Sequence, residues 1–191
     1  MMHKSFFLSP AKLDWQDSEP VASDYEDIYF SRGSGLDESR YVFLANNHLP
    51  QRWQGRESFT IAETGFGTGL NFLLTWQAWR QSPEPRRPLH FISFEKHPLS
   101  ATELEIAISH WPKLAEHTAA LLANYPPPVP GAHRLLLDGG RVRLDLWFDD
   151  AGQSLADLAS LGQRHIDAWY LDGFAPARNR EMWGAELLAC V

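Results

Sequence analysis

The stretch Ser58-Phe-Thr-Ile-Ala-Glu-Thr-Gly-Phe-Gly-Thr-Gly69 places a short apolar run directly before three closely spaced glycines. We predict a buried strand over 58–63 and a helix over Leu70–Gln81, where apolar residues recur on one face. Glycines between a strand and a helix permit a tight turn and let a ligand approach the backbone, because they carry no Cβ atom. The stretch therefore predicts a ligand-binding turn in a fold that alternates strands and helices.

The chain after this turn continues the same alternation. Apolar periodicity and turn residues predict a strand over 90–95, helices over 101–108 and 114–123, strands over 133–137 and 141–148, a helix over 155–161, a strand over 166–172 and a helix over 181–190. The sequence Asp138-Gly139-Gly140 supplies the positive φ angles of a tight turn, so the strands on either side are expected to form a hairpin. Strands that alternate with helices through short loops are typical of a doubly wound sheet in the α/β class.

Residues 1–57 have a different pattern. Short β-like runs at 6–8, 28–30 and 41–44 are separated by turn residues, and no long helical period is present. We therefore predict a β-rich N-terminal extension over 1–57 and a ligand-binding domain over 58–191.

The composition limits the class of protein. A hydrophobic content of 44% over 191 residues is enough for one sizeable core, and no apolar run approaches the roughly 20 residues of a membrane helix. The one cysteine, Cys190, cannot form an internal disulfide, and no Cys/His group has the spacing of zinc ligands. We expect a cytoplasmic protein with no membrane segment and no structural metal. The net charge of −7 is unfavourable for binding nucleic acid through its phosphates.

The spacing of the glycines separates two classes of cofactor. A dinucleotide fingerprint requires a third glycine at position 70, where this chain has Leu70, and an acidic residue about 20 residues after the loop. The acid that ends the next predicted strand, Glu95, comes 26 residues after Gly69. The chain instead has Glu63-x-Gly65-x-Gly67-x-Gly69, which is typical of class I methyltransferases and disfavours a dinucleotide-dependent oxidoreductase. A tight turn that binds no ligand is the remaining alternative.

Acidic residues end several predicted strands, at the edge of the sheet where ligands of this fold bind. Glu95 is expected to accept hydrogen bonds from the two hydroxyls of a ribose. Asp149 and Asp150 are placed either to hold an adenine amino group or to cap a helix. Asp172 can accept a hydrogen bond from an attacking amine while Phe174 stacks on a planar base. A helix cap and a core aromatic are the alternatives for these last two residues.

Five motifs occur in order along almost the whole chain: Asp27-Ile-Tyr-Phe-Ser31, Gly35-Leu-Asp-Glu-Ser-Arg-Tyr-Val-Phe-Leu44, Glu63-Thr-Gly-Phe-Gly-Thr-Gly-Leu-Asn-Phe72, Phe91-Ile-Ser-Phe-Glu-Lys96 and Leu171-Asp-Gly-Phe-Ala-Pro176. Together they closely resemble the family of tRNA 5-methylaminomethyl-2-thiouridine biosynthesis bifunctional proteins. The resemblance implies a Rossmann-like class I methyltransferase that uses S-adenosylmethionine to convert 5-aminomethyl-2-thiouridine at the tRNA wobble position into its methylaminomethyl form. It also implies a C-terminal oxidoreductase domain with FAD, to which nothing in residues 1–191 corresponds.

The resemblance further implies roles for individual residues. The cofactor-binding residues that it implies are Glu63, Gly65, Phe66, Gly67, Gly69, Asn71, Glu95, Lys96 and Asp149. The substrate amine would be held by the catalytic residue Asp172, with Phe174, Tyr29 and Arg40 as further substrate contacts. The implied partner is tRNA.

The length of the chain differs from what the resemblance leads us to expect. A class I methyltransferase sheet normally has seven strands, whereas this chain stops at Val191, in the helix after the fourth strand of that sheet. We expect a fragment whose strand over 166–172 has an unprotected edge, prone to aggregation, and whose activity in isolation is doubtful. A fragment that is inactive, or that only binds cofactor, is therefore the alternative to an active methyltransferase.

Overall fold

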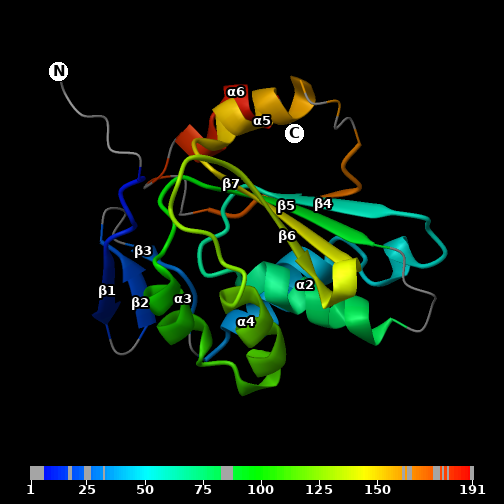
Figure 1. Cartoon of the computed structure of the whole chain (residues 1–191), viewed down its shortest axis with the longest axis horizontal. Coiled ribbons are helices and arrows are strands. Elements are labelled where there is room, and N and C mark those ends of the chain that lie inside the picture. Colours follow the sequence, from blue (N-terminus) through cyan, green and yellow to red (C-terminus); the bar gives the residue numbers. More distant parts are fainter. Residues whose placement is uncertain are drawn as a thin grey trace.

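The central layer of the molecule is a five-stranded sheet (Figure 1). The computed structural model describes residues 7–16, 19–23, 27–31, 33–82, 88–160, 162, 165–173, 177, 179 and 181–189. The strands of the sheet are β4 (Phe59–Glu63), β5 (Leu89–Glu95), β6 (Gly131–Leu137), β7 (Val142–Phe148) and β8 (Ala168–Tyr170). Their order is β6-β7-β5-β4-β8, and every neighbouring pair is parallel except β6 with β7.

Helices cover both faces of this sheet (Figure 1), as a doubly wound fold requires. One face carries α2 (Leu70–Gln81), α3 (Ala101–Ile108) and α4 (Ala115–Leu122), and the other carries α5 (Ala151–Ser160) and α6 (Ala185–Leu188). Short 3-10 turns occur at Gln51–Trp53, Pro112–Leu114, Asp138–Gly140 and Glu181–Trp183. Among the described helices, none is long and apolar enough to span a membrane.

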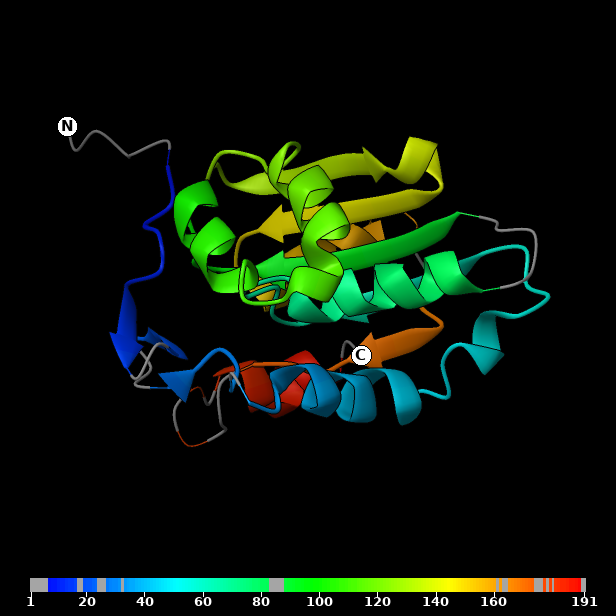
Figure 2. The ribbon, with the colours of Figure 1, turned by 90° about the horizontal axis from the view of Figure 1, so that it is seen from below.

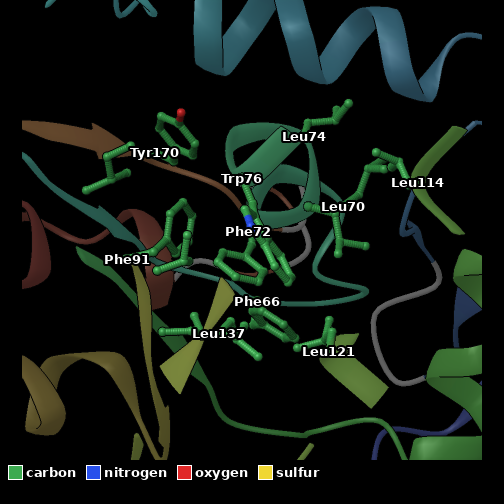
Figure 3. Packing of buried hydrophobic residues seen from close by; sticks show 14 of the residues in the cluster. Phe66, Leu70, Phe72, Leu74, Trp76, Phe91, Leu114, Leu121, Leu137 and Tyr170 are labelled. Carbon is green, nitrogen blue, oxygen red and sulfur yellow. The ribbon is translucent and has the colours of Figure 1, made fainter. Parts of the chain in front are cut away.

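The larger apolar core lies between α2 and the sheet (Figure 3). Phe72 and Trp76 of α2 are buried against Phe91 of β5, and the ring centroids of Phe72 and Phe91 are 5.2 Å apart. Removing one such side chain from water stabilises the fold by about 1.5–3 kcal/mol. A second apolar cluster joins α5 to the opposite face of the sheet. The sheet is therefore fixed from both sides.

Most of the predicted elements are present. Helices α2 and α3 have the predicted bounds, and the hairpin is confirmed by the antiparallel pairing of Leu137 with Val142. Helix α5 begins earlier than predicted, because the Asp150 side chain accepts hydrogen bonds from backbone N–H groups in its first turn. The last predicted helix is interrupted at Gly184, and the strand predicted over 166–172 is shortened to β8.

The N-terminal segment contains both strands and a helix. Strands β1 (Leu13–Gln16), β2 (Glu19–Ala22) and β3 (Asp27–Ile28) form a small antiparallel sheet. The prediction of a β-like run over 41–44 is wrong, because α1 (Gly35–Ser39) continues into a π-helical segment, Arg40–Ala45. Leu44 is buried and Phe43 is half-buried while Tyr41 and Val42 are exposed, a pattern that a strand with alternating faces would not give. Leu44 also belongs to the core beneath α2, so the segment packs directly onto the sheet domain.

Strand β8 lies at the edge of the sheet, beside the helical part of the N-terminal segment (Figure 2). The backbone carbonyl of Tyr170 accepts a hydrogen bond from the N–H of Thr64 after β4, so strand alternation turns the carbonyl of Trp169 outward, and the carbonyl of Asp167 lies just before the strand. The side chains of Arg52 and Asn47 donate hydrogen bonds to these two carbonyls. The edge that we expected to be unprotected is therefore partly covered by side chains.

Candidate functional site

A cleft of 1310 Å³ opens at the carboxyl ends of β4, β5 and β8. It is lined by the glycine loop after β4, the start of α5, Asp172 after β8, and part of the N-terminal segment. The strand order reverses at this point, because the chain passes from β4 to β5 and β7 on one side and then returns to β8 on the other. Ligands of doubly wound folds bind at such a reversal, so this cleft is the candidate site.

The glycine loop has a backbone that other residues would not readily adopt. Gly67 and Gly69 have φ angles of 53° and 71°, in the left-handed region. A Cβ atom at Gly69 would lie 2.7 Å from the ring of Phe66, and one at Gly67 would lie 3.1 Å from the ring of Tyr29. Phe66 anchors the loop, because its ring is buried and its N–H donates to the carbonyl of Phe94 at 2.9 Å. The spacing of the glycines thus follows from close packing on both sides of the loop.

Glu95 connects the end of β5 to the glycine loop. Its Oε2 accepts a hydrogen bond from the backbone N–H of Gly67 at 2.8 Å, and its Oε1 accepts one from the backbone N–H of His97 at 2.8 Å. Burial raises the pKa of Glu95, and these backbone donors oppose the rise. Each carboxylate oxygen has a further lone pair, so Glu95 can brace the loop and still accept hydrogen bonds from ribose hydroxyls.

A buried network beside the cleft joins two further carboxylates. The side-chain amide of Asn71 donates to Oε1 of Glu63 at 2.9 Å and to Oδ2 of Asp172 at 2.6 Å. The hydroxyl of Ser93 donates to Oε2 of Glu63 at 2.7 Å. Burial raises the pKa of Glu63 well above its usual value, and the charge of Asp172 raises it further. All these donors are neutral, so the network itself brings no cation to the two carboxylates.

Asp172 is the network member that follows β8 and lines the cleft. Its Oδ1 accepts a hydrogen bond from the N–H of Gly173 at 2.8 Å, and its backbone carbonyl accepts one from Oγ1 of Thr64 at 2.6 Å. Burial raises the pKa of Asp172 to about 6, opposed by the Gly173 and Asn71 donors, and the charge of Glu38 adds to the rise. A carboxylate with this pKa exchanges its proton near neutrality, which suits a general base.

The two acids after β7 lie differently from each other. Asp150 lines the cleft, forms an ion pair with Lys96 at 3.3 Å, and accepts hydrogen bonds from the N–H groups of Gly152 and Gln153. Asp149 is exposed and is not among the described residues that line the cleft. Asp150 therefore caps α5, and the role predicted for Asp149 in cofactor binding stays a prediction.

The residues predicted to contact substrate are only partly brought together. Tyr29 lines the cleft and packs against Gly67. Arg40 lies in the π-helical segment, 3.6 Å from a carboxylate oxygen of Asp37, and is not among the described lining residues. Phe174 lies outside the described residues.

Sequence reasoning missed two cleft residues of the N-terminal helix. Glu38 and Ser39 of α1 both line the cleft, and Ser39 donates a hydrogen bond to Oδ1 of Asn71. The signal that could have found them is the motif from Gly35 to Leu44, which carried the family resemblance but was interpreted in part as a strand.

The charge of the cleft fits the methyl donor that the resemblance implied. S-adenosylmethionine carries a positive sulfonium and an ammonium group, and carboxylates from Glu38, Glu95 and Asp172 line the cleft. The glycine loop leaves space for a ligand next to the backbone, and Glu95 offers ribose acceptors. The residues present therefore fit this cofactor.

Comparison with known proteins finds similarity to methyltransferases. Residues 112–191 match a family described as S-adenosyl-L-methionine-dependent methyltransferase. The tRNA 5-methylaminomethyl-2-thiouridine biosynthesis bifunctional protein MnmC of Aeromonas salmonicida is 52% identical over 186 residues, which are 94% of this chain and 28% of that protein. The chain is a homologue of MnmC. MnmC of Vibrio cholerae is 49% identical over 190 residues, again covering 28% of that protein. The resemblance drawn from the sequence motifs is confirmed for this portion, and the chain spans about 28% of the length of these relatives.

A solved structure agrees with the fold. The crystal structure of MNMC2 from Aquifex aeolicus matches with a TM-score of 0.71 and 23% identity, covering 95% of this chain and 55% of that one. At this identity the likeness concerns the fold alone. With the family match, it confirms the predicted Rossmann-like methyltransferase fold, and the family description confirms S-adenosylmethionine as the cofactor.

Proposed function

We propose that this chain transfers a methyl group from S-adenosylmethionine to the amine of 5-aminomethyl-2-thiouridine in tRNA, giving 5-methylaminomethyl-2-thiouridine. The observation that carries the proposal is Asp172, a carboxylate with a pKa of about 6 that lines the cleft beside the glycine loop. The similarity to MnmC over 94% of the chain supports the choice of substrate. A non-catalytic fragment is the alternative, and a dinucleotide-dependent oxidoreductase is disfavoured by the methyltransferase match.

For this reaction the protein must orient the substrate amine and remove one proton from it. Bound S-adenosylmethionine supplies an electrophilic methyl group on a positive sulfonium. An aminomethyl group is cationic in water near neutrality, and its nitrogen lone pair must be free before it attacks. Asp172 attracts the cationic form, then accepts a proton directly or through water, and thereby presents the neutral amine to the methyl group.

The surrounding carboxylates favour this sequence of events. Burial raises the pKa of Asp172, and the charges of Glu38 and Glu95 add to the rise, so the proton that it accepts is bound more readily than by an ordinary aspartate. Their charge also attracts the cationic methyl donor, since opposite charges interact strongly in a partly desolvated cleft. The same carboxylates would hold a product without the sulfonium charge less tightly.

The partner and location follow from the same proposal. The name of MnmC describes tRNA modification, and we extend that partner to this chain, with a cytoplasmic location where tRNA is processed. The net charge of −7 does not favour an extended phosphate-binding surface on these residues. Part of the affinity for tRNA is therefore expected from regions outside the 28% of MnmC that the chain matches.

The test is methyl transfer by Asp172→Asn to tRNA that carries 5-aminomethyl-2-thiouridine. We expect a loss of about 100-fold or more in rate, because a positioned general base contributes on that order, while the affinity for S-adenosylhomocysteine stays within about threefold. Asp145→Asn is the matched control, because Asp145 is a buried aspartate of the same sheet that is not among the cleft-lining residues. Wild-type activity in Asp172→Asn, or an equal loss of transfer and cofactor binding, contradicts the proposed role.

A further inference from the structure

Asn71 has every part of its side-chain amide engaged, although it is in the first turn of α2 and only 6% exposed. Its two N–H groups donate to Glu63 and Asp172, and its Oδ1 accepts a hydrogen bond from the hydroxyl of Ser39. These three partners come from β4, from the chain after β8, and from α1. One amide thus connects three separate parts of the fold at the cleft.

The chemistry of the partners fixes which way the amide points. Carboxylates accept hydrogen bonds, so the amide nitrogen has to face Glu63 and Asp172. With the amide reversed, its oxygen would face two carboxylates, and both would lose a donor in a buried position. Ser39 occupies the oxygen side and can donate there. The orientation of Asn71 is therefore determined by its neighbours.

The backbone that carries Asn71 is also held in place. Its carbonyl accepts a hydrogen bond from Oγ1 of Thr75 at 2.7 Å, and the same hydroxyl lies 3.1 Å from the Tyr170 hydroxyl in β8. Helix α2 begins directly at the glycine loop, where the Gly69 carbonyl accepts from the N–H of Leu73 at 2.9 Å. The side-chain amide of Asn71 therefore reaches Asp172 from the first turn of α2, whose backbone is held in place.

We propose that Asn71 is a positioning residue, which holds the Asp172 carboxylate in one orientation by donating to its Oδ2 from an amide fixed by Ser39 and Glu63. Within the part of the chain that the structure describes, the Asp172 carboxylate has one other donor, the N–H of Gly173 on Oδ1. With both oxygens held, the carboxylate plane cannot rotate freely, and its remaining lone pairs point in fixed directions into the cleft. The kinetic part of this inference rests on the proposed function, whereas the structural part does not.

The hydrogen bond from Asn71 also has a measurable electrostatic effect. It lowers the pKa of Asp172 and so opposes the rise that burial causes. Removing this donor should move the pKa of Asp172 further above its usual range. A residue that only filled space in the first turn of α2 would leave that pKa unchanged, and this difference separates positioning from packing.

The experiment titrates Asp172 in protein labelled with ¹³C at aspartate side-chain carboxyls, with its signal assigned from its absence in Asp172→Asn. We expect Asn71→Leu, which keeps most of the volume but no donor, to raise the pKa of Asp172 by about one unit. Thr118→Val is the matched control, because it removes a buried hydroxyl from α4 and is not among the described residues that line the cleft. This control should leave the pKa unchanged. Ser39→Ala removes only the hydrogen bond to Oδ1 of Asn71 and should raise the pKa of Asp172 by a smaller amount. This variant provides the test if Asn71→Leu does not fold.

The outcomes separate this inference from the proposed function. A raised pKa in Asn71→Leu, with S-adenosylhomocysteine affinity within about threefold of wild type, supports positioning even if no methyl transfer is detected. In an active protein, the acid limb of the rate profile should move to higher pH by the same amount. An unchanged pKa of Asp172 in Asn71→Leu and Ser39→Ala overturns the proposal, and a selective loss of cofactor affinity would instead make Asn71 a cofactor ligand.

Discussion

Two aspartates, one within the sheet and one directly after a strand of it, have pKa values that are shifted in opposite directions. Asp172, beside the cleft, has neutral hydrogen-bond donors, and its pKa is raised to about 6. Asp145, in β7, accepts two hydrogen bonds from Arg134 at 2.7 and 2.8 Å and lies 2.7 Å from Nε2 of His90. Although burial raises the pKa of Asp145, these partners prevail and lower it to about 2.

The difference teaches which buried acids are available for chemistry. Asp145 in β7 pairs with His90 in β5 and Arg134 in β6. Its charge is therefore neutralised, and its side chain connects three strands. Among the described residues, the side chain of Asp172 accepts hydrogen bonds from neutral donors, so its charge is left for a ligand to balance. A ligand with a positive sulfonium, or a cationic amine, would supply that balance.

The largest effect is expected for Glu95→Ala, which changes the cleft and should weaken cofactor binding. It removes both ribose acceptors and should weaken S-adenosylhomocysteine binding by roughly 1.5–3 kcal/mol, measured by calorimetry. Glu95 also accepts from the Gly67 N–H, so Glu95→Gln, which keeps one carbonyl acceptor, should lose less. Unchanged affinity in Glu95→Ala would remove Glu95 from the cofactor site.

Asp145→Asn should affect stability and leave ligand binding intact. We expect the free energy of unfolding to fall by about 1–2 kcal/mol at pH 7, because the variant lacks the charge that Arg134 neutralises. The pKa of Asp145 is lowered from 3.8 to about 2, so its contribution is complete above its unfolded value and is lost as the pH falls toward 2. Urea unfolding of wild type and variant should therefore converge in acid. A constant difference at every pH would contradict the assigned charge pairing.

The third expected effect has the opposite sign and belongs to Asp172. Its pKa is raised from 3.8 to about 6, so it contributes stability below its unfolded value that is lost as the pH rises through about 6. Between pH 4 and 7, Asp172→Asn should lose less stability than wild type, by about 2 kcal/mol. Glu63 remains in both proteins, and the loss of the Asp172 charge, which raises the pKa of Glu63, is part of the difference. Parallel urea-unfolding profiles would show that Asp172 titrates normally.

Local patterns were enough to predict the strand, glycine loop and helix that line the cleft. The glycine loop and α2 are encoded by neighbouring residues, through the positive φ angles of Gly67 and Gly69 and the apolar spacing of the helix. The position of Glu95 at the cleft could be predicted, because the end of a strand next to such a loop has a fixed place in a parallel sheet. The 41–44 segment was mispredicted because its apolar residues are arranged by contacts with distant elements, such as Phe43 with Tyr170.

The connections between elements could not be predicted in this way. Nothing local indicates that Ser39 meets Asn71, or that Arg134 and His90 converge on Asp145, because each contact depends on the register between strands or on helix packing. From sequence, the two adjacent acids after β7 suited either an adenine contact or a helix cap, and the resemblance named Asp149. Only the start of α5 shows that Asp150 lines the cleft.

The most direct test of the account is a thermal-shift titration of the chain with S-adenosylhomocysteine and, separately, with NAD. A ligand that binds only the folded state raises the apparent Tm, by an amount that grows with its concentration over Kd. The account predicts a rise with S-adenosylhomocysteine in wild type and in Asp145→Asn, a much smaller rise in Glu95→Ala, and none with NAD. A rise with NAD, or no rise with S-adenosylhomocysteine in wild type, would contradict the assignment of this cleft to a methyl donor.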